Sequence, residues 1–116
     1  MTRLILAMFF SLSLPHLVAA HSPLLSSSPA DGEAVAAAPD ALKMRFKGRA
    51  RLVRFTLSGE AAGDIALGRD HLMIESQTHS ITLPDLAADD YQVRWRAMSA
   101  DGHVIKGGLS FTIHAK

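Results

Sequence analysis

Apolar and polar residues alternate along three stretches of this chain, residues 42–47, 91–97 and 109–114. In the middle stretch, single polar residues separate Tyr91, Val93 and Trp95. Because successive side chains of a β-strand point to opposite faces, this alternation is typical of strands with one buried face. Less regular strands are predicted for residues 23–26, 52–57, 65–67, 72–74 and 80–83. The chain is therefore expected to be all-β.

Turn-forming residues separate these stretches, and about seven short strands at such spacing favour an antiparallel sandwich or barrel. Leu86 followed by Tyr91, at the start of the strand that carries Trp95, fits a tyrosine corner. Residues 26–39 are rich in Ser, Ala, Pro and Gly and predict an irregular connection, while residues 84–90 could form one helical turn. The predicted fold is an immunoglobulin-like β-sandwich of about seven antiparallel strands.

Residues 1–20 have the organisation of a secretory signal peptide. A basic start precedes an apolar run over residues 4–14, and residues 18–20 supply small side chains before a cleavage point. The run is shorter than the about 20 apolar residues that span a bilayer, and no later segment is apolar enough to do so. We expect an exported domain of residues 21–116, without a membrane span, whose first residue is His21.

The expected mature domain carries no excess charge, because removal of Arg3 leaves 11 of the 12 Lys and Arg residues against 11 Asp and Glu. A nucleic-acid-binding domain would need a basic surplus on one face, so no nucleic-acid partner is expected. The basic run in residues 45–54 mostly alternates, which predicts the solvent-facing sides of two adjacent strands. Cysteine is absent, so any metal must bind to nitrogen, oxygen or thioether ligands.

The histidines of the expected mature domain differ in their surroundings. Three are isolated among polar neighbours and are predicted to be ordinary surface residues: His71, His79 and His114. By contrast, a single glycine separates Asp101 from His103, so in an extended segment both side chains leave the same face. They lie in a connection between two predicted strands, where functional residues are common. A simple Asp-Gly turn with an exposed histidine is the alternative.

A free amino terminus at His21 would change the chemistry available to this pair. The α-amine and ring of His21, the His103 ring and the Asp101 carboxylate together offer three nitrogens and one oxygen. That donor set suits one tetragonal Cu(II) ion per chain, and copper also stands highest in the divalent affinity series. The α-amine, with an ordinary pKa of about 7.7–8.0, must lose its proton to bind, so affinity should fall in acid.

Three segments of the chain resemble the CopC/PcoC/YobA family of periplasmic copper-resistance domains. These segments are HSPLLSSSPADG at residues 21–32, the block of residues 86–95, and DGHVIKG at residues 101–107, which is followed by LSFTI. The resemblance spans nearly all of the expected mature domain. The combination of an amino-terminal histidine with Asp-x-His-x-x-x-Gly is its most specific part.

The resemblance implies a small Greek-key β-barrel or sandwich in which His21, Asp101 and His103 bind Cu(II). It implies a periplasmic protein that buffers or carries copper in copper homeostasis or resistance, rather than an enzyme. Copper itself is the implied partner, and an inner-membrane copper transport protein is a candidate second partner.

The chain departs from the better-known family members in its methionines. Those members have a methionine-rich loop with an additional histidine that forms a Cu(I) site. Here Met44, Met73 and Met98 are far apart in sequence, and the corresponding residues 58–69 contain no methionine. Because thioether ligands must cluster to bind Cu(I), we expect this chain to lack that second site.

Two other classes of function remain open from the sequence. A terminal histidine with a second histidine also forms the histidine brace of copper mono-oxygenases, but Asp101 would close the equatorial plane, and one Trp and one Tyr give no flat aromatic platform. An adhesive or structural sandwich with an incidental terminal histidine is the third class. It predicts no tight Cu(II) binding, whereas the enzyme predicts sustained turnover of peroxide or reductant.

Overall fold

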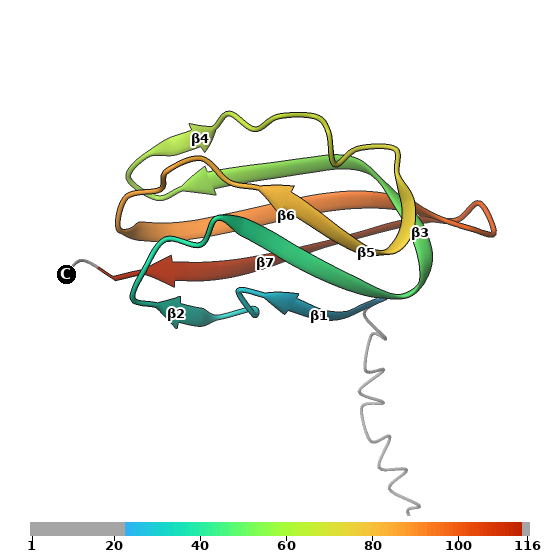
Figure 1. The fold of residues 1–116 in the computed structure, drawn as a ribbon, viewed down its shortest axis with the longest axis horizontal. Coiled ribbons are helices and arrows are strands. Elements are labelled where there is room, and N and C mark those ends of the chain that lie inside the picture. Colours follow the sequence, from blue (N-terminus) through green and yellow to red (C-terminus); the bar gives the residue numbers. More distant parts are fainter. Residues whose placement is uncertain (1–22, 115–116) are drawn as a thin grey trace, which may run out of the picture.

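The computed structural model describes residues 23–114. The regular secondary structure in this part of the chain consists of β-strands (Figure 1). The seven strands are β1 (Leu24–Ser28), β2 (Glu33–Val35), β3 (Ala41–Gly59), β4 (Gly63–Ile65), β5 (Glu75–Thr82), β6 (Asp89–Ser99) and β7 (Val104–Ile113). No helix in the described residues is long and apolar enough to cross a membrane. The prediction of an all-β fold with about seven strands is confirmed.

Strand β3 pairs with four of the other strands, and Figure 1 shows it crossing the fold, bending at one end and returning. Its first half pairs with β1 and β5, and its second half pairs with β6. The register with β5 shifts between Arg45 and Ala50, which marks the bend. The stretches predicted as two strands, residues 42–47 and 52–57, are therefore parts of one strand. The basic run of residues 45–54 likewise lies on one strand rather than two.

The strands form one curled sheet in the order β1-β3-β6-β7-β2, with β4 and β5 also paired to β3. All pairings are antiparallel except that of β2 with β7, which is parallel and places Glu33 opposite Phe111. The expectation of a wholly antiparallel sheet was thus wrong at this edge. Strand β2 also lies within residues 26–39, which were predicted to be irregular. Three residues are too few to show the alternation that identifies a strand.

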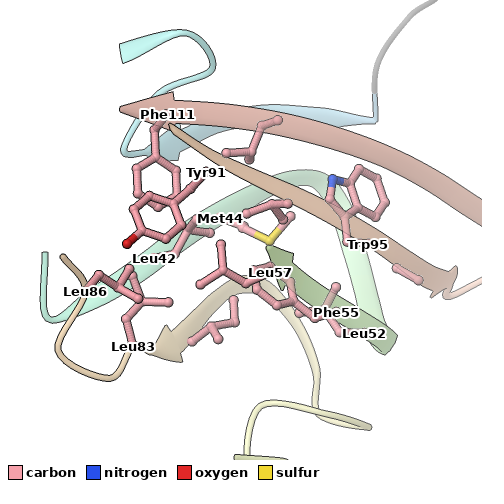
Figure 2. Packing of buried hydrophobic residues seen from close by; sticks show 14 of the residues in the cluster. Leu42, Met44, Leu52, Phe55, Leu57, Leu83, Leu86, Tyr91, Trp95 and Phe111 are labelled. Atoms are coloured by element: carbon pink, nitrogen blue, oxygen red, sulfur yellow. The ribbon is translucent and has the colours of Figure 1, made fainter. Parts of the chain in front are cut away.

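The predicted alternation places every second residue of stretches 42–46, 91–97 and 109–113 in one core (Figure 2). In β6, Tyr91, Val93 and Trp95 are buried while the residues between them are exposed. Met44 and Phe46 bring the opposite half of β3 into the same cluster. The two halves of the curled sheet therefore enclose a single apolar core, as in a β-sandwich.

The predicted tyrosine corner is present at the start of β6. The hydroxyl of Tyr91 donates a 2.6 Å hydrogen bond to the carbonyl of Ala87, and its ring stacks on Phe111 at 5.3 Å. Burial raises the pKa of Tyr91, and the charge of Asp89 adds to this effect. Residues 84–88 contain no helical turn in the structure. This corner ties the connection after β5 to the start of the strand that leads to residue 101.

The predicted strand at residues 72–74 is a turn instead. Leu72 N–H donates to the carbonyl of Arg69 at 3.0 Å, and Met73 has a φ of 66°, in the left-handed region. Met73 N–H then donates to the carbonyl of Leu52 at 2.8 Å, so the segment crosses the edge of β3 without forming a ladder. Three consecutive apolar side chains suggested a strand, but the backbone conformation of Met73 prevents one.

Candidate metal centre

Asp101 and His103 lie in the tight turn that joins β6 to β7. Ser99 N–H donates to the carbonyl of His103 at 2.8 Å, and Gly102 N–H donates to the carbonyl of Ser99 at 2.9 Å. Gly102 has a φ of 86°, a conformation that side chains other than hydrogen disfavour. The simple Asp-Gly turn and the functional pair are therefore compatible, because the turn is what brings the two side chains together.

The side chains of Asp101 and His103 contact each other directly. Oδ2 of Asp101 lies 2.8 Å from Nδ1 of His103. Both remain accessible, with 67% of the aspartate side chain and 80% of the histidine side chain exposed. Because Nδ1 faces the carboxylate, Nε2 is the ring nitrogen left to bind a metal, an arrangement common among metal-binding histidines.

Ser99 completes this arrangement and was missed in the sequence. Its hydroxyl donates to Oδ1 of Asp101 and accepts a 3.2 Å hydrogen bond from the backbone N–H of His103. The Ser99 hydroxyl, followed by the ring of His103, holds the pKa of Asp101 down at about 2. Asp101 is therefore ionised at every pH at which a histidine could bind copper. Ser99 lies two residues before Asp101, and this spacing is the signal that could have identified it in the sequence.

A short segment of β3 anchors both the hairpin and the beginning of the described chain. Ala100 N–H donates to the carbonyl of Arg49 at 3.1 Å, and Lys47 N–H donates to the carbonyl of Pro23 at 2.9 Å. These two bonds, only two residues apart on β3, bring the amino-terminal end of the described chain close to the hairpin. His21, the other predicted ligand, lies outside the described residues.

Within residues 23–114, no three His, Cys, Asp or Glu side chains come close enough together to hold a metal ion. The described residues therefore supply two candidate ligands, Asp101 and His103, at one accessible place.

Two of the three histidines predicted to be surface residues are buried. His71 packs edge-on against Phe55, with 5.6 Å between ring centroids, and His79 packs likewise against Phe46 at 5.5 Å. The Nε2 of His79 lies 2.9 Å from the carbonyl of Ser76. The prediction of a surface position was wrong for both, because each imidazole ring packs against an aromatic side chain of the core. It was right for His114, which is exposed.

Burial also changes the acid–base behaviour of His71. Desolvation lowers its pKa, with a smaller contribution from nearby His79, while the charge of Asp70 acts in the opposite direction. A buried neutral imidazole of this kind is part of the core and is not arranged with other metal-binding side chains.

The glycine that closes the Asp-x-His-x-x-x-Gly signature has a packing role. Gly107 lies opposite Trp95 in the β6–β7 ladder, and a Cβ atom placed on it would come within 2.6 Å of the indole ring. Trp95 is buried, and its Nε1 has no hydrogen-bond partner among the described residues. The signature therefore combines two side chains at the turn with a core contact four residues further along.

The methionines occupy different environments. Met44 is buried in the core, as its alternation with charged residues predicted, whereas Met73 and Met98 are exposed. The absence of a Cu(I) site stays a prediction.

Comparison with known proteins relates the chain to a family. The family model described as the CopC domain matches residues 24–114. Among solved structures, CopC from Methylosinus trichosporium OB3b matches with a TM-score of 0.65 and 28% identity over 83% of this chain and 98% of that one. PcoC from Escherichia coli, a methionine-rich copper resistance protein, matches with a TM-score of 0.61 and 29% identity over 82% of this chain and 100% of that one.

A curated relative is much longer than this chain. The copper transport protein CutJ of Bacillus subtilis (strain 168) is 26% identical over 113 residues, which are 94% of this chain but only 21% of CutJ. The chain thus spans about a fifth of the length of this relative. The family model covers most of the chain and nearly all of its described part. The chain belongs to the CopC family.

Proposed function

We propose that this chain is an exported copper-binding domain that holds one Cu(II) ion through His21, Asp101 and His103, and buffers or carries it outside the cytoplasm. The observation that supports this most is the exposed contact between Asp101 and His103 at the tip of a fixed hairpin. The carboxylate already holds the imidazole and leaves Nε2 free, and it turns from Nδ1 toward the ion when the metal binds.

The chain path supports the participation of His21. Pro23 is anchored to Lys47 and the hairpin is anchored to Arg49. An extended chain advances about 3.3–3.6 Å per residue, so His21 can lie up to roughly 7 Å from Pro23. The segment of β3 that anchors Pro23 also anchors the hairpin, and we propose that the α-amine and imidazole of His21 bind the same ion as the hairpin.

The donor set supports copper in its oxidised state. Two imidazoles, an amine and a carboxylate make a site of nitrogen and oxygen without thiolate, which suits tetragonal Cu(II). We assign Asp101 as the carboxylate ligand, whose charge offsets part of the charge of the ion. In the metal-free protein the same carboxylate orients His103.

The named relatives support a role in copper handling. One of them is a copper resistance protein, and another is a copper transport protein. Because the longer relative includes a domain like this one within a copper transport protein, we propose an inner-membrane copper transport protein as the physiological partner. The amino-terminal features of a signal peptide support export to the periplasm.

The mass of the intact exported protein, measured with and without one equivalent of Cu(II), tests this proposal. A chain that begins at His21 and gains the mass of one copper ion would support both the processing site and the stoichiometry. A different first residue would contradict the chelate, and an unchanged mass with copper would contradict the binding function.

A further inference from the structure

The solvent-facing side of β3, β6 and β7 gathers cations from three strands. Arg54 lies opposite Arg96, and Arg96 lies opposite Lys106, so three cationic residues form one row across the sheet. Arg94 adds a fourth cation in the next row, between Thr56 and Gly108. All four basic side chains are exposed. We call this surface the basic face, defined by Arg54, Arg94, Arg96 and Lys106.

Within the described part of the chain, the cations of the basic face have no anionic partner. Among residues 23–114, the ion pair that the structure shows is the one between Asp101 and His103. Like charges directly opposite each other on a sheet repel and destabilise the pairing. The acidic residues of the same side come further along the strands, where Asp64 lies opposite Ser58 and Asp90 accepts a hydrogen bond from Thr112. The row therefore has an unbalanced positive charge that an external anion would neutralise.

The shape of the basic face favours a ligand that enters it. An open depression of about 680 Å³ lies between the four cationic residues. Gly108, which lies opposite the exposed Arg94, lines it on the β7 side and leaves space where a side chain would otherwise stand. Arginine predominates, and its planar guanidinium binds carboxylates through two parallel hydrogen bonds. A flat membrane surface would contact the rim of such a depression without filling it.

We propose that the basic face docks an acidic segment of a partner protein, with carboxylates entering the depression between Arg54, Arg96 and Lys106. The chain as a whole is close to neutral, so this local charge is what such a partner would recognise. The next row of the same side holds Met98 opposite Val104, both exposed, and the Asp101–His103 turn follows. A segment bound on the basic face therefore lies beside the hairpin end of the molecule.

Titration of the metal-free exported protein with a synthetic peptide of alternating Glu and Ser tests the proposal, with binding followed by calorimetry at low and physiological salt. We expect saturable binding that weakens as salt rises, because exposed charge pairs are screened. The double variant R54Q/R96Q should bind the peptide roughly tenfold more weakly, a difference of about 1.4 kcal/mol.

The matched control is the double variant K43Q/R45Q, which removes the same charge from exposed positions on the other half of β3. It should alter peptide binding less than about twofold, the effect of net charge alone. Equal weakening in both variants, or no saturable binding of the peptide, would overturn the proposal. So would binding to vesicles containing phosphatidylglycerol when the peptide does not bind. None of these measurements involves copper, so their failure leaves the proposed metal site untouched.

Discussion

Oδ2 of Asp101 and Nδ1 of His103 are 2.8 Å apart across a single glycine, in a turn that both residues expose to solvent. This contact fixes the imidazole so that Nε2 faces away from the carboxylate. It also keeps an ionised carboxylate beside the ring, because the pKa of Asp101 is held at about 2. The hairpin is therefore ready to receive a divalent cation without first losing a proton from Asp101.

Replacement of Ser99 by alanine should weaken copper binding although Ser99 is not a ligand. The variant removes the hydroxyl that donates to Asp101, so the pKa of Asp101 should rise toward its ordinary value and the carboxylate should lose its orientation. Loss of such a supporting group lowers metal affinity by about 10-fold or more. Competition titration with a Cu(II) chelator measures the effect.

The control for this variant is S110A, since Ser110 is an exposed residue of β7 away from the turn. Its copper affinity should match that of the unmodified protein. If S99A binds Cu(II) as tightly as S110A, the proposed support of Asp101 by Ser99 is wrong.

The two hairpin ligands should differ in importance. His103→Ala removes one of three nitrogen ligands and should weaken Cu(II) binding by more than roughly a hundredfold. Asp101→Asn should weaken it less, by about tenfold, because the amide still orients the ring but no longer offsets charge. The same competition titration ranks the variants. A larger loss for Asp101→Asn than for His103→Ala would show that the carboxylate dominates the site.

The buried His71 predicts how stability depends on pH. Burial lowers its pKa in the folded state below the ordinary value of 6.5, so the unfolded chain takes up a proton first as pH falls. The free energy of unfolding should therefore decrease from pH 6.5 down to the folded pKa and then change no further through this group. Urea unfolding of metal-free protein between pH 7 and pH 5 measures this decrease.

Replacement of His71 by leucine should flatten that part of the pH profile, because an apolar side chain fills the same space without titrating. His114→Gln, at an exposed position, should leave the slope unchanged. An equal slope in H71L and the unmodified protein would exclude His71 as the source.

The contact between Gly107 and Trp95 predicts the effect of one added methyl group. Gly107→Ala would place a Cβ atom 2.6 Å from the indole and should destabilise the fold by about 1–3 kcal/mol, as overpacking does. Gly48→Ala is the matched control, since a Cβ there meets nothing within 4 Å. Urea unfolding compares the two. Similar stability for both variants would mean that Trp95 shifts without penalty.

The sequence predicted the strands that have one buried face, and the reason is geometric. A pleated strand that covers a core must alternate, so the alternation of β6, of β7 and of the first half of β3 was visible in the residues themselves. Strand β2 was not predicted, because its three residues form a strand only by pairing with the edge of β7. Its parallel direction depends on the path of the whole chain and leaves no local pattern.

The candidate site was predictable to the extent that it is local. Asp101 and His103 are joined by a turn, so their spacing in sequence determined their contact in space. The burial of His71 and His79 was not predictable in this way, because it depends on Phe55 and Phe46, which come from a different strand. The polar character of the two histidines suggested a surface position, but packing against aromatic rings buries both of them.

The most direct test of the copper site compares Cu(II) affinity between a chain that begins at His21 and the same chain with one alanine added before it. The addition separates the free α-amine from the His21 imidazole and leaves Asp101 and His103 unchanged. The proposed chelate predicts a loss as severe as that of His103→Ala, more than roughly a hundredfold. Equal affinity of the two chains would contradict it.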